Sequence, residues 1–386
     1  MENTNSGNGK IIIVGDLFPV PSNFDLFSKG DVQTLFGQKI CNLFASADYR
    51  ICNLEGALTD GTERCEKTGP AYIAPTSTVK AFKELGIDCC TLANNHITDG
   101  EHSGVLDTMR TLDGYGIQYV GAGENGNSIR KFHVFEVGNH KIGLYNVAET
   151  MYNAPTETKA GAHLYDEYLV CKDIESYKKA CDYLIVIYHG GIEQYRYPSP
   201  EIKKRFHRMA DSGANMVLSQ HTHCIGCEEY YNGSYLLYGQ GNMLLFTLLK
   251  GLTDTGLILE IGFDDCGKVS IKKHIVHSEN GLTRYDDSQD FTDFDVRSAK
   301  VDDDAFLDAH FQEFCYSKLG QYIKAFKGKD YIGELFRRFF PKRYKKEYFK
   351  KAYEKKQLLF TLHTLRSEQN RETAIEGIKC LLDKMN

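Results

Sequence analysis

The chain has 386 residues, of which 42% are apolar, and its formal net charge at pH 7 is -6. This length predicts one large domain plus an appendage, or two domains, with enough apolar residues for a sizeable core. The net charge gives no general attraction to nucleic acid, so we expect no nucleic-acid partner.

The first residues of the chain are polar. Residues 1–9 are rich in Gly and Asn and are expected to be disordered. No apolar segment of a secretory signal comes before the first predicted strand. We therefore expect a cytoplasmic location, in which the twelve cysteines are reduced thiols.

Strands and helices alternate in the first part of the chain. The continuous β-branched run 10–14 is typical of a buried strand in a parallel sheet. Apolar residues with helical spacing predict a helix over 32–45. The pattern then predicts a strand at 49–54, a loop at 56–76, a helix at 78–85, a strand at 87–92, a helix at 101–114 capped by its final Gly114, and a strand at 117–120.

Antiparallel strands become more frequent later in the chain. The predicted elements are a hairpin of 131–137 and 141–147, an irregular stretch at 149–168, a helix at 173–180, a strand at 182–188, a helix at 200–212, a strand at 214–218, a hairpin at 228–238 turning at Asn232-Gly233, and a hairpin of 256–263 and 268–277. This order predicts a layered α/β domain over residues 10–285.

The composition changes after about residue 285, and we expect residues 290–386 to form a helical extension. Its segment 337–356 holds ten Lys/Arg against two Glu, interleaved with aromatic residues. Three interpretations are open. They are a solvated face whose aromatic residues pack on the domain, contact with an anionic membrane surface or polyanion, and, least favoured, nucleic-acid binding.

Two pairs of cysteines lie close together in the sequence. Cys89 and Cys90 are neighbours in a predicted strand, so their side chains should point to opposite faces and serve as core thiols. Cys224 and Cys227 stand in a C-x-x-C pattern beside two histidines, but a zinc site there would need a very tight loop and lacks a second such pair.

Polar residues follow the ends of five predicted strands. In an open α/β sheet, ligands bind outside the carboxyl ends of the strands, so these side chains are expected to meet at one edge. They are Asp16, Glu55, Asn95-His96, His189 and His221/His223. Mixed oxygen and nitrogen donors suit Zn, Mn, Fe or Co better than Ca or Mg, and six donors are too many for one tetrahedral ion. They fit two divalent ions that share a bridging carboxylate, with His96 placed to protonate a leaving group.

Seven motifs in order also resemble a known family. They are Asp16, Asn53-Leu54-Glu55-Gly56, Leu92-Ala93-Asn94-Asn95-His96, Tyr119-Val120-Gly121-Ala122-Gly123, His189-Gly190-Gly191, His221-Thr222-His223 and Tyr238-Gly239-Gln240-Gly241-Asn242. The family comprises CapA-type capsule and poly-γ-glutamate synthesis proteins, relatives of the calcineurin-like metallophosphoesterases. The resemblance covers about residues 10–265.

The resemblance implies a four-layer αββα sandwich with a dinuclear metal site. Asp16 and His223 would hold one ion, Glu55 would bridge, and the second ion would be held by Asn95, His189 and His221, with His96 as the acid/base residue. Two positions depart from the metallophosphoesterases. Phe18 stands where they have a ligand His, so one ion has a ligand fewer, and the bridging residue is Glu55 instead of Asp.

Three functions follow as hypotheses. The first is a metal-dependent hydrolase, phosphoesterase-like or amide-cleaving, that acts in bacterial capsule or exopolymer biosynthesis on an anionic polymer or a phosphorylated small molecule. The second is a non-hydrolytic assembly or export factor that uses the fold as a binding module and contacts the inner face of the membrane through 337–356. The third is a metal-assisted isomerase with His96 as the base.

Overall fold

The computed structural model describes residues 9–129, 131–151, 153–245, 250–326 and 354–385. The chain divides into two compact units, Met1–Cys65 with Ala71–Leu307, and Glu66–Pro70 with Asp308–Asn386. The expected disorder of residues 1–9 concerns mainly residues outside the described ranges, and Gly9 is the first residue of a strand. The domain bounds 10–285 and 290–386 stay predictions.

The first sheet of the larger unit has eight strands. Its order is β18 (Leu282–Tyr285), β17 (Val269–Glu279), β16 (Thr255–Phe263), β1 (Gly9–Leu17), β2 (Tyr49–Leu54), β5 (Cys89–Thr91) and β6 (Gln118–Val120), and β15 (Asn242–Leu244) pairs with the end of β1. Strands β1, β2, β5 and β6 are parallel, whereas β16, β17 and β18 extend the sheet with antiparallel pairing.

The second sheet has six strands, in the order β13 (Glu228–Tyr231), β14 (Ser234–Leu237), β12 (Met216–Gln220), β11 (Tyr183–His189), β9 (His140–Ala148) and β8 (Phe132–Val137). The four central strands are parallel, and each edge strand is the antiparallel arm of a hairpin. The predicted turn at Asn232-Gly233 is confirmed. Both residues have positive φ, which gives a two-residue turn a twist that matches the right-handed twist of the two strands.

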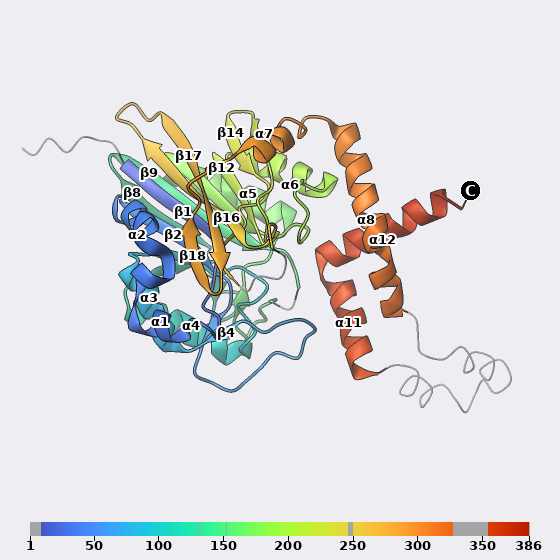
Figure 1. Ribbon diagram of the computed structural model, residues 1–386, viewed down its shortest axis with the longest axis horizontal. Helices are drawn as coiled ribbons and strands as arrows, with labels where there is room; N and C mark the ends of the chain where they lie inside the picture. Colours follow the sequence, from blue (N-terminus) through green and yellow to red (C-terminus); the bar gives the residue numbers. More distant parts are fainter. Residues whose placement is uncertain (1–8, 130, 152, 246–249, 327–353, 386) are drawn as a thin grey trace, which may run out of the picture. The chain divides into compact units, whose positions relative to one another are not determined.

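Helices cover the outer face of each sheet (Figure 1). The first sheet packs against α1 (Phe24–Lys29), α2 (Val32–Ala45), α3 (Val79–Glu84) and α4 (Glu101–Gly114). The second packs against α5 (Glu167–Tyr177) and α6 (Pro200–Asp211). A third apolar cluster fills the space between the two sheets. The predicted four-layer αββα sandwich is therefore confirmed.

The layers explain why strand β1 is continuously apolar. Ile11 and Ile13 lie in the core between the sheets, whereas Ile12 and Val14 lie under the helices, because successive side chains of a strand point to opposite faces. Both faces of β1 pack against apolar side chains, so no polar residue alternates with the isoleucines. Cys89 and Cys90 divide between the same two cores, as predicted.

Some element bounds differ from the predictions. The helix expected at 173–180 begins earlier, at Glu167, because Asp166 caps it by accepting a hydrogen bond from the Leu169 amide. Gly114 does not cap α4, and the left-handed glycine is Gly116. Helix α1 and strands β15 and β18 were not predicted, since each is six residues or shorter and carries little periodicity.

Short elements complete the larger unit. They are β3 (Ala57–Leu58) paired with β4 (Ile73–Ala74), β7 (Ala122–Gly123) paired with β10 (Gly161–Ala162), the 3-10 turns Thr76–Thr78 and Lys178–Ala180, and α7 (Thr292–Ser298). The pair β3–β4 lies within the predicted loop 56–76, and β10 lies within the predicted irregular stretch 149–168.

The C-terminal part is helical, as predicted. Among its described residues, the helices that follow α7 are α8 (Asp304–Phe326), α11 (Lys355–Arg366) and α12 (Glu368–Asp383). Gly377 lets α12 approach the backbone of α8, because a Cβ there would lie 2.7 Å from the Cys315 carbonyl oxygen. Residues 337–353 of the basic segment lie outside the described residues. Among the described helices, none combines the length and the apolar character that crossing a membrane requires.

Candidate metal centre

The residues proposed as ligands come from both sheets. Asp16 lies near the end of β1, Glu55 directly follows β2, and Asn95 follows β5. His189 is the last residue of β11, and His221 directly follows β12. The carboxyl ends of the parallel strands in the two sheets thus supply one group of side chains, although the sequence pattern predicted only that they would share a sheet edge.

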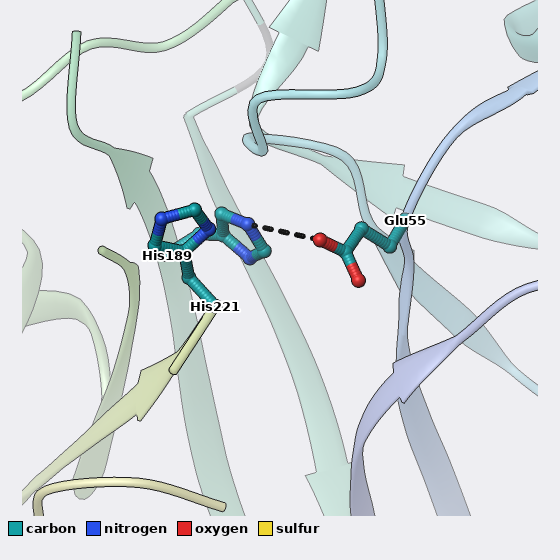
Figure 2. A group of neighbouring side chains, drawn as sticks. All are labelled: Glu55, His189 and His221. Atoms are coloured by element: carbon teal, nitrogen blue, oxygen red, sulfur yellow. Dashed lines mark ion pairs between the residues drawn. The ribbon is translucent and has the colours of Figure 1, made fainter. Parts of the chain in front are cut away.

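All six side chains lie in one buried cluster. Asp16 Oδ2 lies 3.2 Å from His223 Nδ1, and Asp16 Oδ1 lies 3.9 Å from His189 Nδ1. His189 Nε2 lies 2.9 Å from Asn95 Oδ1 and 3.6 Å from Glu55 Oε1. Ligand atoms of Glu55, His189 and His221 lie within 4.8 Å of one another, and so do those of Asp16, Glu55 and His223. Figure 2 shows the two imidazoles on the same side of Glu55.

Glu55 belongs to both groups and has the most unusual environment. Its side chain is fully buried, and neither carboxylate oxygen forms a hydrogen bond with any described residue. Burial, and then the charge of Asp16, raises the pKa of the Glu55 carboxyl well above its ordinary value. A buried carboxylate without hydrogen bonds is costly, and a bound cation would remove that cost.

Asp16 and His223 form a buried pair. Burial raises the pKa of Asp16, but hydrogen bonds and charge from His223 and His189 outweigh it and lower that pKa to about 2. Burial lowers the pKa of His223, but the charges of Glu55 and Asp16 raise it to about 10. Asn53 Nδ2 donates a further hydrogen bond of 2.8 Å to Asp16 Oδ1. Asp16 is thus held as an anion and fixed in orientation.

The other two histidines of the cluster, His189 and His221, have lowered pKa values. Burial lowers the pKa of His189 well below its ordinary value and the pKa of His221 to about 4. Both imidazoles are therefore neutral at pH 7, the form in which a ring nitrogen can bind a metal ion.

The backbone at His221 and His223 does not continue the extended conformation of β12. An extended backbone would project both imidazoles to the same side. Instead, the φ angles are +87° at His221 and +55° at His223, a left-handed conformation that non-glycine residues rarely adopt. One ring therefore faces His189, with centroids 5.0 Å apart, and the other faces Asp16. Such strain is characteristic of functional sites.

The loop 239–242 supports His223. Asn242 Oδ1 lies 3.0 Å from His223 Nδ1, and Asn242 pairs with Asp16 through strand β15. The backbones approach closely here, since a Cβ on Gly15 would lie 2.2 Å from the Gly241 carbonyl oxygen.

His96, the predicted acid/base residue, lies beside the cluster. Its Nδ1 is 2.6 Å from Asp99 Oδ2, and its ring stacks on Tyr72 with centroids 4.0 Å apart. The same Asp99 oxygen accepts a hydrogen bond of 2.6 Å from the Tyr72 amide. The carboxylate thus fixes the ring and its tautomer, which leaves Nε2 for proton transfer. Neighbouring Asn94 is structural, with its amide bonded to the carbonyl oxygen of Leu54.

Two carboxylates near the cluster were not predicted. Glu149 directly follows β9, and its Oε1 lies 3.4 Å from His221 Nε2. Glu193 forms a further group with His221 and His223. The strand-end rule that identified Glu55 applies equally to Glu149, but strand β9 was predicted to end one residue early, within the hairpin. Glu193 lies in a loop and carried no such signal.

Phe18 occupies the position where the resemblance expects a histidine. It is buried, stacks on Tyr72 with ring centroids 5.9 Å apart, and lies against Gly56, where a Cβ would approach its ring within 2.5 Å. This position therefore contributes apolar packing and no ligand atom.

The donor set fits divalent transition ions. It combines neutral imidazoles, an amide oxygen and buried carboxylates, of which Glu55 belongs to both groups of donors. The fold and the cluster together define the class: an αββα sandwich with a buried group of histidines and carboxylates that could hold metal ions.

The comparison with family models identifies the family. Residues 10–246 match the model described as bacterial capsule synthesis protein PGA_cap, and the chain belongs to this family. The predicted membership among CapA-type proteins is thereby confirmed.

Several curated relatives are similar over the same region. Capsule biosynthesis protein CapA of Bacillus anthracis is 29% identical over 188 residues, 47% of this chain and 45% of the relative. A probable polyglutamine synthesis accessory protein of Mycobacterium tuberculosis is 28% identical over 212 residues, 52% of this chain and 56% of the relative. PGA biosynthesis protein CapA of Bacillus subtilis is 25% identical over 218 residues, 55% and 56% of the two chains. The chain thus spans about half the length of the curated relatives it matches.

Solved structures are more distant. A hypothetical protein from Thermus thermophilus has a TM-score of 0.45 and 14% identity, covering 70% of this chain and all of the other. A 5'-nucleotidase precursor from the same organism has a TM-score of 0.39 and 13% identity, covering 72% of this chain and 55% of the other. Likeness at this level says nothing about activity.

Proposed function

We propose that the protein is a metal-dependent hydrolase of bacterial capsule or polyglutamate-type polymer biosynthesis, acting on an anionic polymer or a phosphorylated precursor. The observation that carries the proposal is Glu55, a fully buried carboxylate that forms no hydrogen bond with a described residue and faces His189 and His223. Membership in the capsule synthesis family and the names of the curated relatives support the biological role.

The proposed site residues would have separate roles as ligands of two ions and as the proton donor. His223 with Asp16 would hold one divalent ion, His189, His221 and Asn95 the other, and Glu55 would bridge them. When bound, such a pair supplies Lewis acidity and a water of lowered pKa. His96 would deliver a proton from Nε2 to the leaving group, with Asp99 holding Nδ1. Tyr72 covers one face of the His96 ring and limits its rotation.

One experiment separates this proposal from its alternatives. The purified full chain is analysed for metal content and then assayed with a generic aryl phosphate and a γ-glutamyl amide. Two ions with turnover support a hydrolase. Two ions without turnover favour the assembly factor, or the isomerase if a carbonyl substrate takes up deuterium from solvent. A chain that binds no divalent ion contradicts the proposal.

We also propose that an anionic membrane surface is a partner, as the basic segment suggested. Within the described residues, α11 carries Leu358, Leu362 and Leu365 with exposed fractions of 50%, 38% and 52%. Their spacing of four and three residues places them along one face. The helix has Lys355, Lys356 and Arg366 and no acidic residue. A basic amphipathic helix of this kind favours anionic lipid. A cytoplasmic location stays a prediction.

Leu362→Glu is expected to weaken sedimentation with vesicles containing anionic lipid by about tenfold, because it removes an exposed apolar side chain that would enter the lipid and adds a negative charge that the lipid repels. The matched control is Ile378→Glu on α12. Ile378 is similarly exposed, at 41%, but its helix carries Glu372, Glu376 and Asp383. Equal losses in both variants, or equal binding to neutral vesicles, would count against a specific role for α11.

A further inference from the structure

The Glu149 carboxylate is held between the ends of three parallel strands. The residue directly follows β9, and its amide donates to the His189 carbonyl oxygen at the end of β11. Its carbonyl oxygen accepts a hydrogen bond of 3.2 Å from Asn153 Nδ2. The Gly191 amide lies 3.5 Å from Oε2, and His221 Nε2, just past β12, lies 3.4 Å from Oε1. The side chain is buried, with an exposed fraction of 2%.

This contact distinguishes the two nitrogens of His221. An imidazole that binds a metal ion through one ring nitrogen carries its proton on the other. A carboxylate facing one nitrogen holds the proton there, which leaves the lone pair on the other. Nε2 faces Glu149, so Nδ1 would be the nitrogen that binds the ion shared with His189 and Glu55. The left-handed backbone at His221 helps to turn the ring into this orientation.

We propose that Glu149 is a positioning residue, which fixes the tautomer and orientation of His221 for one of the two metal ions. The inference rests on the proposed function, since it presupposes that the cluster binds metal. Carboxylates that hold the outer nitrogen of a ligand histidine also increase its basicity, and their removal commonly weakens metal binding about 10- to 100-fold.

Glu193 provides a matched comparison on the same nitrogen. Its Oε1 lies 3.9 Å from His221 Nε2, but its side chain is 43% exposed. Solvent screens such a charge in part. The buried Glu149, which is also closer, should therefore hold the Nε2 proton of His221 more firmly than Glu193 does.

The test measures binding of Co²⁺ to the full chain by calorimetry, elemental analysis after dialysis and visible absorption. The wild type is expected to bind two ions. Glu149→Ala should weaken one of them about 10- to 100-fold and change the Co²⁺ absorption band, while the other ion binds as before. Glu149→Gln keeps the shape of the side chain and an acceptor oxygen, so its affinity for the ion should lie between those of the wild type and Glu149→Ala. The control is Glu279→Gln, which changes a carboxylate with an exposed fraction of 75% that belongs to no group of possible metal ligands among the described residues. It should match the wild type within about threefold.

The possible results separate the two proposals. If the wild type binds two ions and both Glu149 variants bind them with unchanged affinity and spectrum, the role of Glu149 is refuted while the metal centre stands. If the wild type binds no ion, the proposed function and this inference both fail. If Glu149→Ala does not fold when followed by circular dichroism without metal, Glu149→Gln decides the question.

Discussion

Glu55→Gln is expected to stabilise the metal-free protein and to remove most of the stabilisation that metal ions provide. Without metal, Glu55 is a buried carboxyl with no hydrogen bond to a described residue, and a neutral amide of the same shape lowers that cost by about 1–3 kcal/mol. With metal, the wild type should gain about 4 kcal/mol at an ion concentration about 1,000 times Kd, and the variant much less. The effect of the mutation on the free energy of unfolding thus changes sign: it is stabilising without metal and destabilising with metal.

The pH dependence of the metal-free proteins gives a second check. Burial raises the pKa of Glu55 in the folded state above its value in the unfolded chain. Its stabilising contribution is therefore fully present below the unfolded pKa and is lost as pH rises through the folded pKa. Glu55→Gln removes this loss, so its stability advantage should grow with pH. The variant also removes the charge that raises the pKa of His223, so the comparison is made over the pH range below about 10, where His223 stays charged in the wild type.

The measurement is urea unfolding in chelator and in saturating Mn²⁺ or Zn²⁺ over a range of pH. Glu279→Gln is the control, because its side chain is 75% exposed, belongs to no group of possible metal ligands among the described residues, and should change stability little in either condition. A Glu55→Gln protein that is less stable than the wild type in chelator, and equally stabilised by metal, would contradict the assignment of Glu55 as a bridging ligand.

His96→Gln is expected to lower turnover by about 10²- to 10⁴-fold while leaving metal content unchanged. Glutamine cannot transfer a proton as imidazole does, and general acid–base catalysis contributes an effect of this size. His96 contacts Asp99 and Tyr72, and no group of possible metal ligands found among the described residues includes it. Metal loading should therefore survive the change.

The assay is steady-state hydrolysis of the best substrate found for the wild type, with elemental analysis of each variant. Asp99→Asn should reduce turnover less than His96→Gln, because the ring remains stacked on Tyr72. His277→Gln is the control, since that partly exposed histidine pairs with Asp286 away from the cluster. Full activity in His96→Gln, or loss of its ions, would show that His96 does not act as the acid/base residue.

The predicted ligand set depended on one physical regularity. Parallel strands present their carboxyl ends at the same edge, so polar residues at the ends of apolar runs are brought together whatever their separation in the chain. This regularity predicted Asp16, Glu55, Asn95, His189 and His221 from the sequence. It failed for Glu149 because β9 was predicted only as one arm of an antiparallel hairpin, whereas its other side pairs in parallel with β11.

The amino-acid sequence by itself determined the order of the elements, the layered α/β class and the family, because hydrophobic periodicity and local motifs are written in neighbouring residues. Only the tertiary structure decided that the edges of two separate sheets face one another, that Glu55 is buried without a hydrogen bond to a described residue, and that His221 and His223 have left-handed backbone. These features depend on burial and on partners far apart in the chain, such as Asp16 and His223. The residues next to Asp16 or His223 in the sequence do not indicate which distant side chain each will contact.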